Sequence, residues 1–233
     1  MNNLSHATLA PVIAIDGPSS SGKGTVSQLL AKRINWHFLD SGAIYRVLAL
    51  AVGNERISPD EPAAIAQLAS ILNVKFRSFI DPGSSQVILD GRDVTDEIRT
   101  PQCGSCASQI SVFPEVRQAL LGRQREFCQF PGLVADGRDM GTVVFPNASL
   151  KIYLDASSEE RARRRYEQLK RKGMDVTIDR IFAEITERDR RDKMRRAAPL
   201  KPAIDAVLLD TTHRGIDEVV ESVWQNAQQR GLI

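Results

Sequence analysis

Five short apolar runs, each ending in aspartate, constrain the fold of this 233-residue chain more than any other feature. The runs lack the polar alternation of a strand with one face in water, which is typical of parallel strands covered on both faces. Helical patterns separate the runs, so the sequence predicts an α/β, doubly wound domain. The predicted strands are Val12–Asp16, Trp36–Asp40, Leu133–Asp136, Leu150–Asp155 and Val207–Asp210.

The aspartates that end these runs have two interpretations. In a parallel sheet the ligand crevice lies outside the carboxyl ends of the strands, so a ring of carboxylates there could hold a cation. Each carboxylate could instead cap the helix that follows it. For Asp155 and Asp210 we favour helix capping.

The segment between the second and third runs is too long for one crossover and predicts a small antiparallel insert. Val74–Ile80 and Gln86–Leu89 have the pattern of a hairpin across the turn sequence DPGSS. Asp90-Gly91 is a strong second turn signal. Pro114 then stands where the first residue of a helix is expected.

Three further signals predict a pair of helices after the fourth strand. Ser157 and Glu160 have the spacing of a capping box, which predicts a helix through 161–172. Gly173 ends that helix. Another helix begins near Ile178.

Composition excludes some classes of protein. No run of eighteen apolar residues exists, and the N-terminal segment lacks a basic region before an apolar stretch, so we expect a cytoplasmic protein without a membrane span. A net charge of +2 argues against a general nucleic-acid coat protein. An odd number of cysteines indicates a reducing compartment. Cys103 and Cys106 have the spacing of half a zinc site, but small thiols filling the core are the favoured interpretation.

The first run leads directly into GPSSSGKGT, which has the spacing of a phosphate-binding loop (P-loop). Backbone N–H groups of such a loop surround phosphate oxygens, and the following helix adds its positive N-terminal end. Lys23 is expected to reach the β and γ phosphates, and Thr25, or Ser21 by a different route, to reach the shell of a magnesium ion. The sequence therefore predicts ATP binding by Gly17, Pro18, Ser19, Ser20, Ser21, Gly22, Lys23, Gly24 and Thr25.

Positive charge is concentrated late in the chain. Residues 161–196 hold fourteen Lys and Arg against seven Asp and Glu. Either a solvated helical surface or a local anion site explains this segment. The spacing favours a site, because an apolar stripe continues as an Arg–Asp–Arg stripe on one helical face. The residues of that face are Ile181, Ile185, Arg188, Asp192 and Arg195.

Three longer motifs resemble those of bacterial cytidylate kinases, which are P-loop nucleoside monophosphate kinases. They are DSGAIYR at 40–46, DGRDMGT at 136–142 and ERDRRD at 187–192. The resemblance runs from about Val12 to Asp210 and implies a three-layer P-loop fold with a five-stranded parallel sheet, an antiparallel insert and a short helical lid. It departs at Ser20, where the family usually has glycine; serine fits only where φ is negative or mildly left-handed.

The resemblance also implies a division of the chain into three regions. The core would comprise 11–40, 109–155 and 174–233, the monophosphate-binding region 41–108, and the lid 156–173. The lid would bring Arg164 or a neighbour over the transferring phosphoryl group, although Arg161, Arg163 and Arg165 crowd the same turn.

The acceptor site follows partly from position and partly from the resemblance. After the third strand, Asp136 stands where a carboxylate would hold the water shell of Mg²⁺, and Arg138 where it would meet the acceptor phosphate. The resemblance places Arg188 on substrate phosphates, Asp192 on the acceptor ribose and Arg195 near the acceptor phosphate. It adds contacts with the acceptor nucleotide from Ser41, Tyr45 and Arg46, and with the cytosine edge from Ser108, Arg117 and Asp139.

Tyr45 taken alone would instead be a core residue.

The expected activity is transfer of the γ-phosphoryl group of ATP, with Mg²⁺, to CMP or dCMP by a monomer, with Lys23, Arg138, Arg164 and Arg188 as catalytic residues. Two alternatives remain: another small-molecule P-loop kinase, such as one for UMP, and a nucleotide-dependent ATPase that binds RNA through the arginine-rich segment. The second is disfavoured because that segment carries few aromatic residues for stacking on bases.

Overall fold

A computed structural model describes residues 10–78 and 85–233 of the chain. The N-terminal segment on which the absence of a signal sequence was argued lies outside the described residues, as do Ile80 and most of the DPGSS turn.

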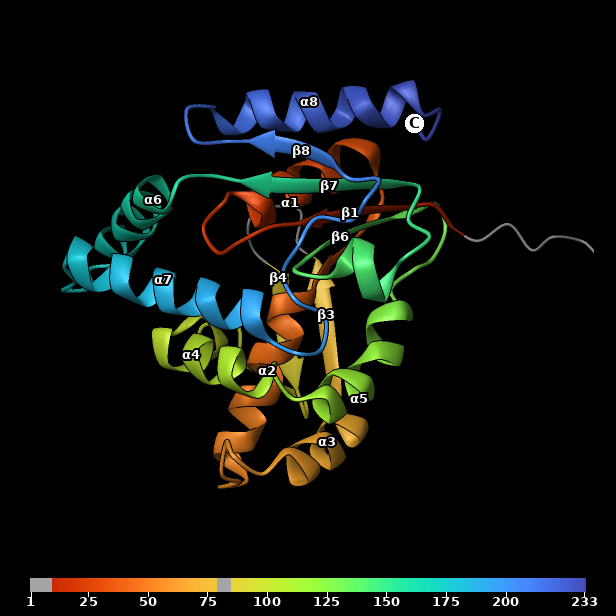
Figure 1. The fold of residues 1–233 in the computed structure, drawn as a ribbon. Coiled ribbons are helices and arrows are strands. Elements are labelled where there is room, and N and C mark those ends of the chain that lie inside the picture. Colours follow the sequence, from red (N-terminus) through yellow and green to blue (C-terminus); the bar gives the residue numbers. More distant parts are fainter. Residues whose placement is uncertain (1–9, 79–84) are drawn as a thin grey trace, which may run out of the picture.

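A five-stranded parallel sheet forms the centre of the fold, as the sequence predicts (Figure 1). Its strand order is β2-β6-β1-β7-β8, so the phosphate-loop strand is central. Three strands are buried along their length because both faces are covered by helices. The strands are β1 (Val12–Asp16), β2 (His37–Asp40), β6 (Leu133–Gly137), β7 (Leu150–Asp155) and β8 (Val207–Asp210).

Burial on both faces was wrong for the two edge strands, since β2 has only Leu39 buried and β8 has no buried residue. The residues of β8 alternate between half-buried and exposed, and Leu208 is 64% exposed. An edge strand has a neighbour on one side only, which leaves part of it in water.

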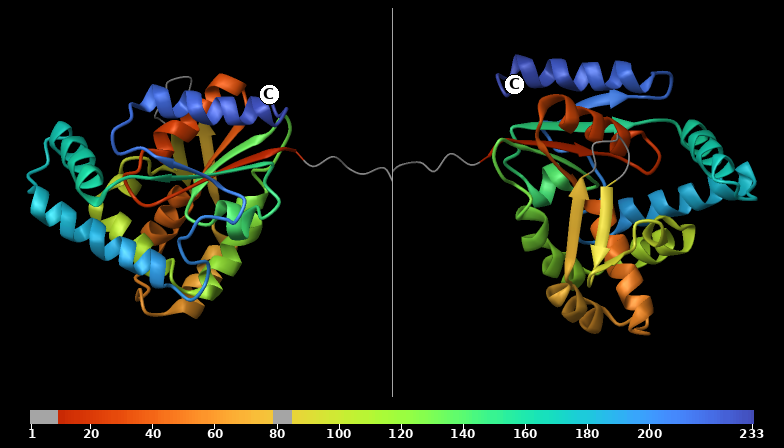
Figure 2. Two further views of the ribbon diagram at one scale, coloured as in Figure 1. Left: turned by 45° about the horizontal axis from the view of Figure 1, so that its top comes forward. Right: turned by 180° about the vertical axis from the view of Figure 1, so that it is seen from behind.

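Two apolar cores, one on each face of the sheet, make the three layers. On one face, α1 (Lys23–Ile34) and α8 (Ile216–Gln229) pack against the strands (Figure 2). The opposite face packs on the larger core, to which most of the remaining helices contribute. These helices are α2 (Ser41–Asn54), α3 (Pro62–Ile71), α4 (Pro101–Ile110) and α5 (Pro114–Arg125). Alternate residues of β1 enter the two cores, as the pleat of a strand requires.

The predicted antiparallel insert is present and has one strand more than expected. It comprises β3 (Val74–Ser78), β4 (Ser85–Leu89) and β5 (Arg92–Asp93). The second turn is the predicted Asp90-Gly91, both with positive φ, as a tight two-residue hairpin needs. The third strand is only two residues long, too short for any periodic pattern to reveal.

A helical hairpin projects from the carboxyl end of the sheet (Figure 1). Its helices, α6 (Ser158–Arg171) and α7 (Ile178–Met194), enclose a small core that includes Leu169, Ile181 and Ile185. The N-cap prediction is confirmed, since the N–H of Glu160 donates to Ser157 Oγ across 3.2 Å. Two single-turn elements, η1 (Glu97–Arg99) and η2 (Met140–Val144), complete the described structure.

The helix-capping prediction was wrong for two of the terminal aspartates. Asp155 Oδ1 accepts from the N–H of Ala156, and Asp210 Oδ1 accepts from the N–H of Thr212, so both stabilise turns before the next helix begins. Asp40 does cap a helix, because its Oδ1 accepts from the N–H of Ala43 in the first turn of α2. Capping is therefore decided by the length of the connection.

Among the residues that the structure describes, no helix is long and apolar enough to cross a bilayer.

Candidate active site

The phosphate-loop motif connects β1 to α1, in the strand–loop–helix context that its function requires. Gly17 is required by space, since a Cβ there would lie 2.0 Å from the carbonyl oxygen of Leu154. Gly22 has φ 90° and ends the loop at the first turn of α1. Ser20 has φ 61°, so of the two conformations in which serine was expected to fit here, negative φ or mildly left-handed, it adopts the left-handed one.

Lys23 opens α1 with its ammonium directed back across the loop. Its Nζ donates to the carbonyl oxygen of Pro18 across 2.9 Å, and the side chain is buried. Burial, together with the nearby Arg138, lowers its pKa to about 7, while Asp136 opposes the shift. A buried ammonium beside other cations is a site that gains from a bound anion.

Asp136 lies at the carboxyl end of β6, directly beside Asp40 in the sheet register. Its Oδ1 is buried without a hydrogen-bond partner, and burial raises its pKa to about 7. A Cβ built on Gly24 would lie 3.1 Å from Oδ2, a tight contact, so glycine lets this carboxylate lie close beside the loop. Thr25, one residue later, has an exposed side chain. A buried carboxylate oxygen without a partner suits Mg²⁺, which prefers oxygen ligands.

Arg138, in the turn after β6, forms an ion pair with Asp192, which is buried in the last turn of α7. Arg138 Nε donates to Asp192 Oδ2 across 2.9 Å. Burial raises the pKa of Asp192, but Arg138, Arg188 and Arg195 together hold it below its ordinary value.

Arg188 lies one turn earlier on α7 and has its Nε buried without a partner. Burial and the charge of Arg138 lower the pKa of Arg188 to about 9, which is a large shift for a guanidinium. Arg46 and Arg165 repel the same group. These cations crowd together, so an anion bound among them would relieve their repulsion.

A second polar cluster lies beside the first. Arg117 Nη2 donates to Asp139 Oδ2, and Arg195 Nη2 lies 3.7 Å from the other oxygen of Asp139. The guanidinium carbon of Arg117 is 5.6 Å from the centroid of the Tyr45 ring. Ser108 Oγ is buried without a hydrogen-bond partner. All five side chains are buried, so the cluster can present directed donors and acceptors to a ligand away from water.

Tyr45 lies both in an apolar core and beside a predicted site residue. It belongs to the larger apolar core, and its ring also faces Arg117. Burial raises the pKa of its hydroxyl to about 12, so that hydroxyl remains a neutral hydrogen-bonding group.

The sequence analysis missed two residues, Gln124 and Gly104, that contact the predicted site residues Ser41 and Arg46. Ser41 Oγ donates to Gln124 Oε1 across 2.7 Å, which fixes the first residue of α2 from α5. Arg46 Nη1 donates to the carbonyl oxygen of Ile98 across 2.9 Å, and a Cβ on Gly104 would lie 2.8 Å from its Nη2. Gln124 lies on the apolar face of its helix, and a polar residue at such a position indicates a specific hydrogen bond. The sequence around Gly104 gives no such indication.

Asp16 was expected only as one of the ring of carboxylates. Its two oxygens accept from the N–H groups of Met140 and Gly141, each across 2.8 Å. Burial raises its pKa to about 6, although these two N–H groups oppose the shift. The last residue of β1 therefore fixes the start of η2, next to Arg138 and Asp139.

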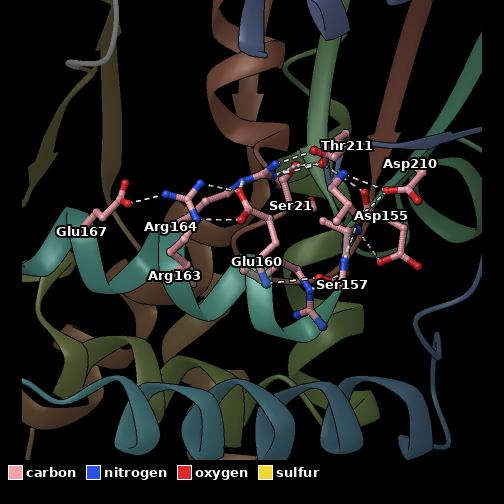
Figure 3. Close-up of polar contacts among 12 residues, drawn as sticks. Ser21, Asp155, Ser157, Glu160, Arg163, Arg164, Glu167, Asp210 and Thr211 are labelled. Carbon is pink, nitrogen blue, oxygen red and sulfur yellow. Dashed lines mark hydrogen bonds and ion pairs between the residues drawn. The ribbon is translucent and has the colours of Figure 1, made fainter. Parts of the chain in front are cut away.

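The arginines at the start of α6 have separate environments. Arg161 is buried and paired with Asp189 across 2.7 Å. Arg163 pairs with Glu160 and Glu167 at the surface (Figure 3). Arg164 pairs with Glu160 across 2.8 Å and also reaches the phosphate loop. Arg165 Nη1 donates to Gln168 Oε1 across 2.6 Å.

The structure thus brings most of the predicted site residues into two adjoining clusters at the carboxyl ends of β1 and β6. One contains Lys23, Asp136, Arg138, Arg188 and Asp192, and the other contains Tyr45, Ser108, Arg117, Asp139 and Arg195. Arg195 lies in the second cluster, beside Asp139, and is the residue that follows the last turn of α7.

The cysteines are free thiols, and no group of three or more His, Cys, Asp or Glu among residues 10–78 and 85–233 is arranged to hold a metal ion. Cys103 Sγ lies 3.2 Å from the carbonyl oxygen of Arg46, on the core side of α4.

Comparison with known proteins agrees with the motifs. A family model described as cytidylate kinase matches residues 13–229. A cytidylate kinase of Shewanella sp. (strain MR-4) is 59% identical over 221 residues, which cover 95% of this chain and 96% of that protein. A cytidylate kinase of Aeromonas hydrophila subsp. hydrophila is 56% identical over 222 residues, with 95% of this chain and 96% of that protein covered. The chain belongs to the cytidylate kinase family.

Proposed function

We propose that this protein transfers the γ-phosphoryl group of ATP to CMP or dCMP, giving CDP or dCDP and ADP. The observation that carries the proposal is the juxtaposition of a buried phosphate-loop lysine with the Arg138–Asp192 pair and Arg188. A phosphoryl transferase must hold two anions end to end, and this requires converging cations.

The donor triphosphate binds at residues 17–25, with Lys23 leaving the carbonyl of Pro18 for the β and γ phosphates. Backbone N–H groups of the loop and the N-terminal end of α1 bind the same oxygens. The left-handed Ser20 keeps the loop in the curved form that such binding uses.

Mg²⁺ would be held by Asp136 through water and by the hydroxyl of Thr25, since the partnerless Oδ1 of Asp136 supplies a hard oxygen at the right edge of the sheet. When bound, the ion would neutralise charge on the β and γ phosphates. Few protein ligands are expected, because Mg²⁺ keeps several waters and binds substrate phosphates directly.

The acceptor phosphate binds between Arg138 and Arg188. Its attacking oxygen is already ionised at neutral pH, so no strong general base is needed and positioning supplies the catalysis. Asp192 orients Arg138 through their 2.9 Å hydrogen bond and leaves its other oxygen for the acceptor ribose. Arg164 stabilises charge on the transferring group from the lid side.

Cytosine recognition is assigned to the second cluster. Asp139 accepts from the exocyclic amino group of the base, while Ser108 and Arg117 donate to its ring acceptors. Ser41, Tyr45, Arg46 and Arg195 complete the acceptor site. A site of buried, directed polar groups rejects a base with the opposite donor pattern, because a mismatch leaves those groups unpaired.

We further propose that the protein is a cytoplasmic monomer with the division into core, monophosphate-binding region and lid given above. The lid helix α6 packs on α7 through a small core that is separate from the two cores on the sheet, which supports treating α6 as a region of its own. An RNA groove along residues 161–196 is disfavoured by charge, because Arg161, Arg163, Arg164, Arg180 and Arg190 are each paired with a carboxylate.

A coupled assay of ADP formation with ATP, Mg²⁺ and a panel of CMP, dCMP, UMP and AMP tests the function. We expect CMP and dCMP to be used at least about a hundredfold better, by kcat/KM, than AMP. Equal use of UMP would favour the alternative kinase, and ADP formation that depends on RNA instead of a monophosphate would favour the ATPase.

A further inference from the structure

The backbone of the phosphate loop is held from outside at two carbonyl groups. The carbonyl oxygen of Ser19 accepts from Arg161 Nη1 across 3.3 Å. The carbonyl oxygen of Ser21 accepts from Thr211 Oγ1 across 3.0 Å and from Arg164 Nη1 across 3.4 Å (Figure 3). The Ser19 carbonyl belongs to the peptide group just before Ser20, and the Ser21 carbonyl belongs to the second peptide group after it; Ser20 itself has φ 61°.

This arrangement has a physical reason. A residue with a Cβ is disfavoured in the left-handed region, so a free loop would gain by rotating Ser20 to a negative φ. Such a rotation would redirect the chain after Ser20 relative to the chain before it, so the carbonyls of Ser19 and Ser21 could not both keep their hydrogen-bond partners. The bonds from outside therefore oppose the relaxation of Ser20 and keep the loop curved.

Thr211 is the residue on which this restraint depends most directly. It is buried, and it lies in the connection between β8 and α8, far from the loop in sequence. Its hydroxyl is 3.0 Å from the carbonyl oxygens of both Ser21 and Asp155. The oxygen of Asp155 also accepts a short 2.8 Å bond from the N–H of Thr211, whereas the other bond to the Ser21 oxygen, from Arg164, is a long 3.4 Å, so the one hydroxyl hydrogen is assigned to Ser21.

Thr211 is also fixed by its other contacts. Its hydroxyl oxygen accepts from Arg164 Nη1 across 3.1 Å, and Glu160 holds the same guanidinium across 2.8 Å (Figure 3). The far side of the loop is restrained in a similar way, because Arg161 donates to Ala156 O and Ser158 Oγ and pairs with Asp189.

We propose that Thr211, acting with Arg161 through the carbonyls of Ser21 and Ser19, is a positioning residue that holds Ser20 left-handed and so shapes the loop for the donor triphosphate. The identity of the donor as ATP rests on the proposed function. Thr211 touches no reacting atom in this role, and the acceptor site does not depend on it.

Thr211→Val tests the inference, because valine has the shape of threonine without the hydroxyl. We expect the dissociation constant of Mg·ATP, measured by calorimetry, and the KM for ATP to rise about tenfold, with the KM for CMP within twofold of wild type. Thr211→Ser keeps the hydroxyl and should restore most of the affinity. The melting temperature of each variant shows whether it is folded.

Two further variants separate positioning from a merely structural role. Ser20→Gly in the Thr211→Val background should recover most of the lost ATP affinity, because glycine adopts a left-handed φ without steric cost. Thr212→Val is a matched control: that hydroxyl donates to Asp210 and accepts from Ser157 N, and it contacts no loop atom in the described structure.

Equal increases in the KM for ATP and CMP, unchanged ATP affinity in folded Thr211→Val, or no recovery with glycine at position 20 would overturn the inference. Failure of the proposed function is distinguishable, because wild type would then not phosphorylate CMP while the ATP titrations would still compare the variants.

Discussion

Arg138, in the turn after β6, donates from Nε to Oδ2 of Asp192 on α7 across 2.9 Å; Asp192 is buried and Arg138 is half-buried. The pair connects the carboxyl end of the sheet to the helical hairpin, so one ionic contact joins the elements that hold donor and acceptor. Breaking a buried pair from one side leaves an uncompensated charge, which typically costs about 3–5 kcal/mol.

Asp192→Asn should therefore weaken acceptor binding and lower stability together. Without the carboxylate, Arg138 is no longer oriented and is drawn toward other acceptors. We expect the KM for CMP to rise at least about tenfold with the KM for ATP little changed, and the free energy of unfolding in urea to fall by about 3 kcal/mol. Glu187→Gln, which breaks an exposed pair on the same helix, is the control. A larger effect on ATP than on CMP would contradict this assignment.

Lys23→Ala should remove catalysis and leave the fold intact. The lysine neutralises charge that develops between donor and acceptor, and loss of one such group costs about 10²–10³ in kcat. Because burial of Lys23 lowers its pKa, removing the ammonium should not lower the melting temperature. Single-turnover kinetics and thermal melts check both statements, with the exposed Lys193→Ala as control. Normal turnover by Lys23→Ala would refute the role.

Asp139→Asn should change the choice of base. A carboxylate only accepts, whereas an amide also donates, so the variant should tolerate a base carbonyl where cytosine has its amino group. We expect the ratio of kcat/KM for CMP over UMP to fall about ten- to a hundredfold. The ratio is independent of the folded fraction, which matters because Asp139 also pairs with Arg117 and Arg195. An unchanged ratio would place base recognition elsewhere.

Gln124→Leu should affect only the acceptor. The substitution leaves Ser41 Oγ without its 2.7 Å partner, so Ser41 is no longer held toward the site. We expect the KM for CMP to rise several-fold with the KM for ATP within twofold, on the scale of one lost hydrogen bond of about 1 kcal/mol. Gln118→Leu, an exposed position on the same helix, is the matched control. Parallel losses for both substrates would indicate general damage.

Asp16 should make stability depend on pH in a defined window. Its pKa is raised from 3.8 to about 6, so the folded state binds this proton more tightly than the unfolded state. Above pH 6 the buried Asp16 carboxylate is charged and destabilises the fold to its full extent. As the pH falls from 6 toward 3.8, protonation in the folded state relieves this, and the free energy of unfolding rises by at most about 1.4 kcal/mol per pH unit.

Urea unfolding of wild type and Asp16→Asn at several pH values isolates this contribution, because other carboxylates titrate in both proteins. Wild type should gain stability relative to the variant as the pH is lowered from 6 to 4. A difference that stays constant across that window would show that the carboxyl of Asp16 titrates normally.

Much of the fold was predictable because it depends on local patterns. Apolar runs bounded by turn residues gave all five parallel strands to within one residue, and the capping pattern at Ser157 gave the start of α6. The failures depend on tertiary position. Nothing in the run Val207–Asp210 tells that β8 lies at an edge, and an aspartate at a strand end caps a helix only where the connection is short enough.

The candidate site divides in the same way. Lys23, Arg138 and Arg188 follow from motifs and spacing. Gln124 and Thr211 were missed because each acts through a hydrogen bond to a residue far away in sequence, 83 positions for Ser41 and 190 for Ser21. A polar residue on the apolar face of α5 does signal a role for Gln124, but neither hydrogen-bond partner can be named until the fold brings the distant segments together.

A crystal structure of the protein with CMP and a non-hydrolysable ATP analogue tests the central claim most directly. The account predicts the triphosphate around residues 17–25 with its terminal phosphate at Lys23, and the CMP phosphate between Arg138 and Arg188 with cytosine at Asp139. CMP bound away from the Arg138–Asp192 pair, or a triphosphate outside the loop after β1, would contradict it.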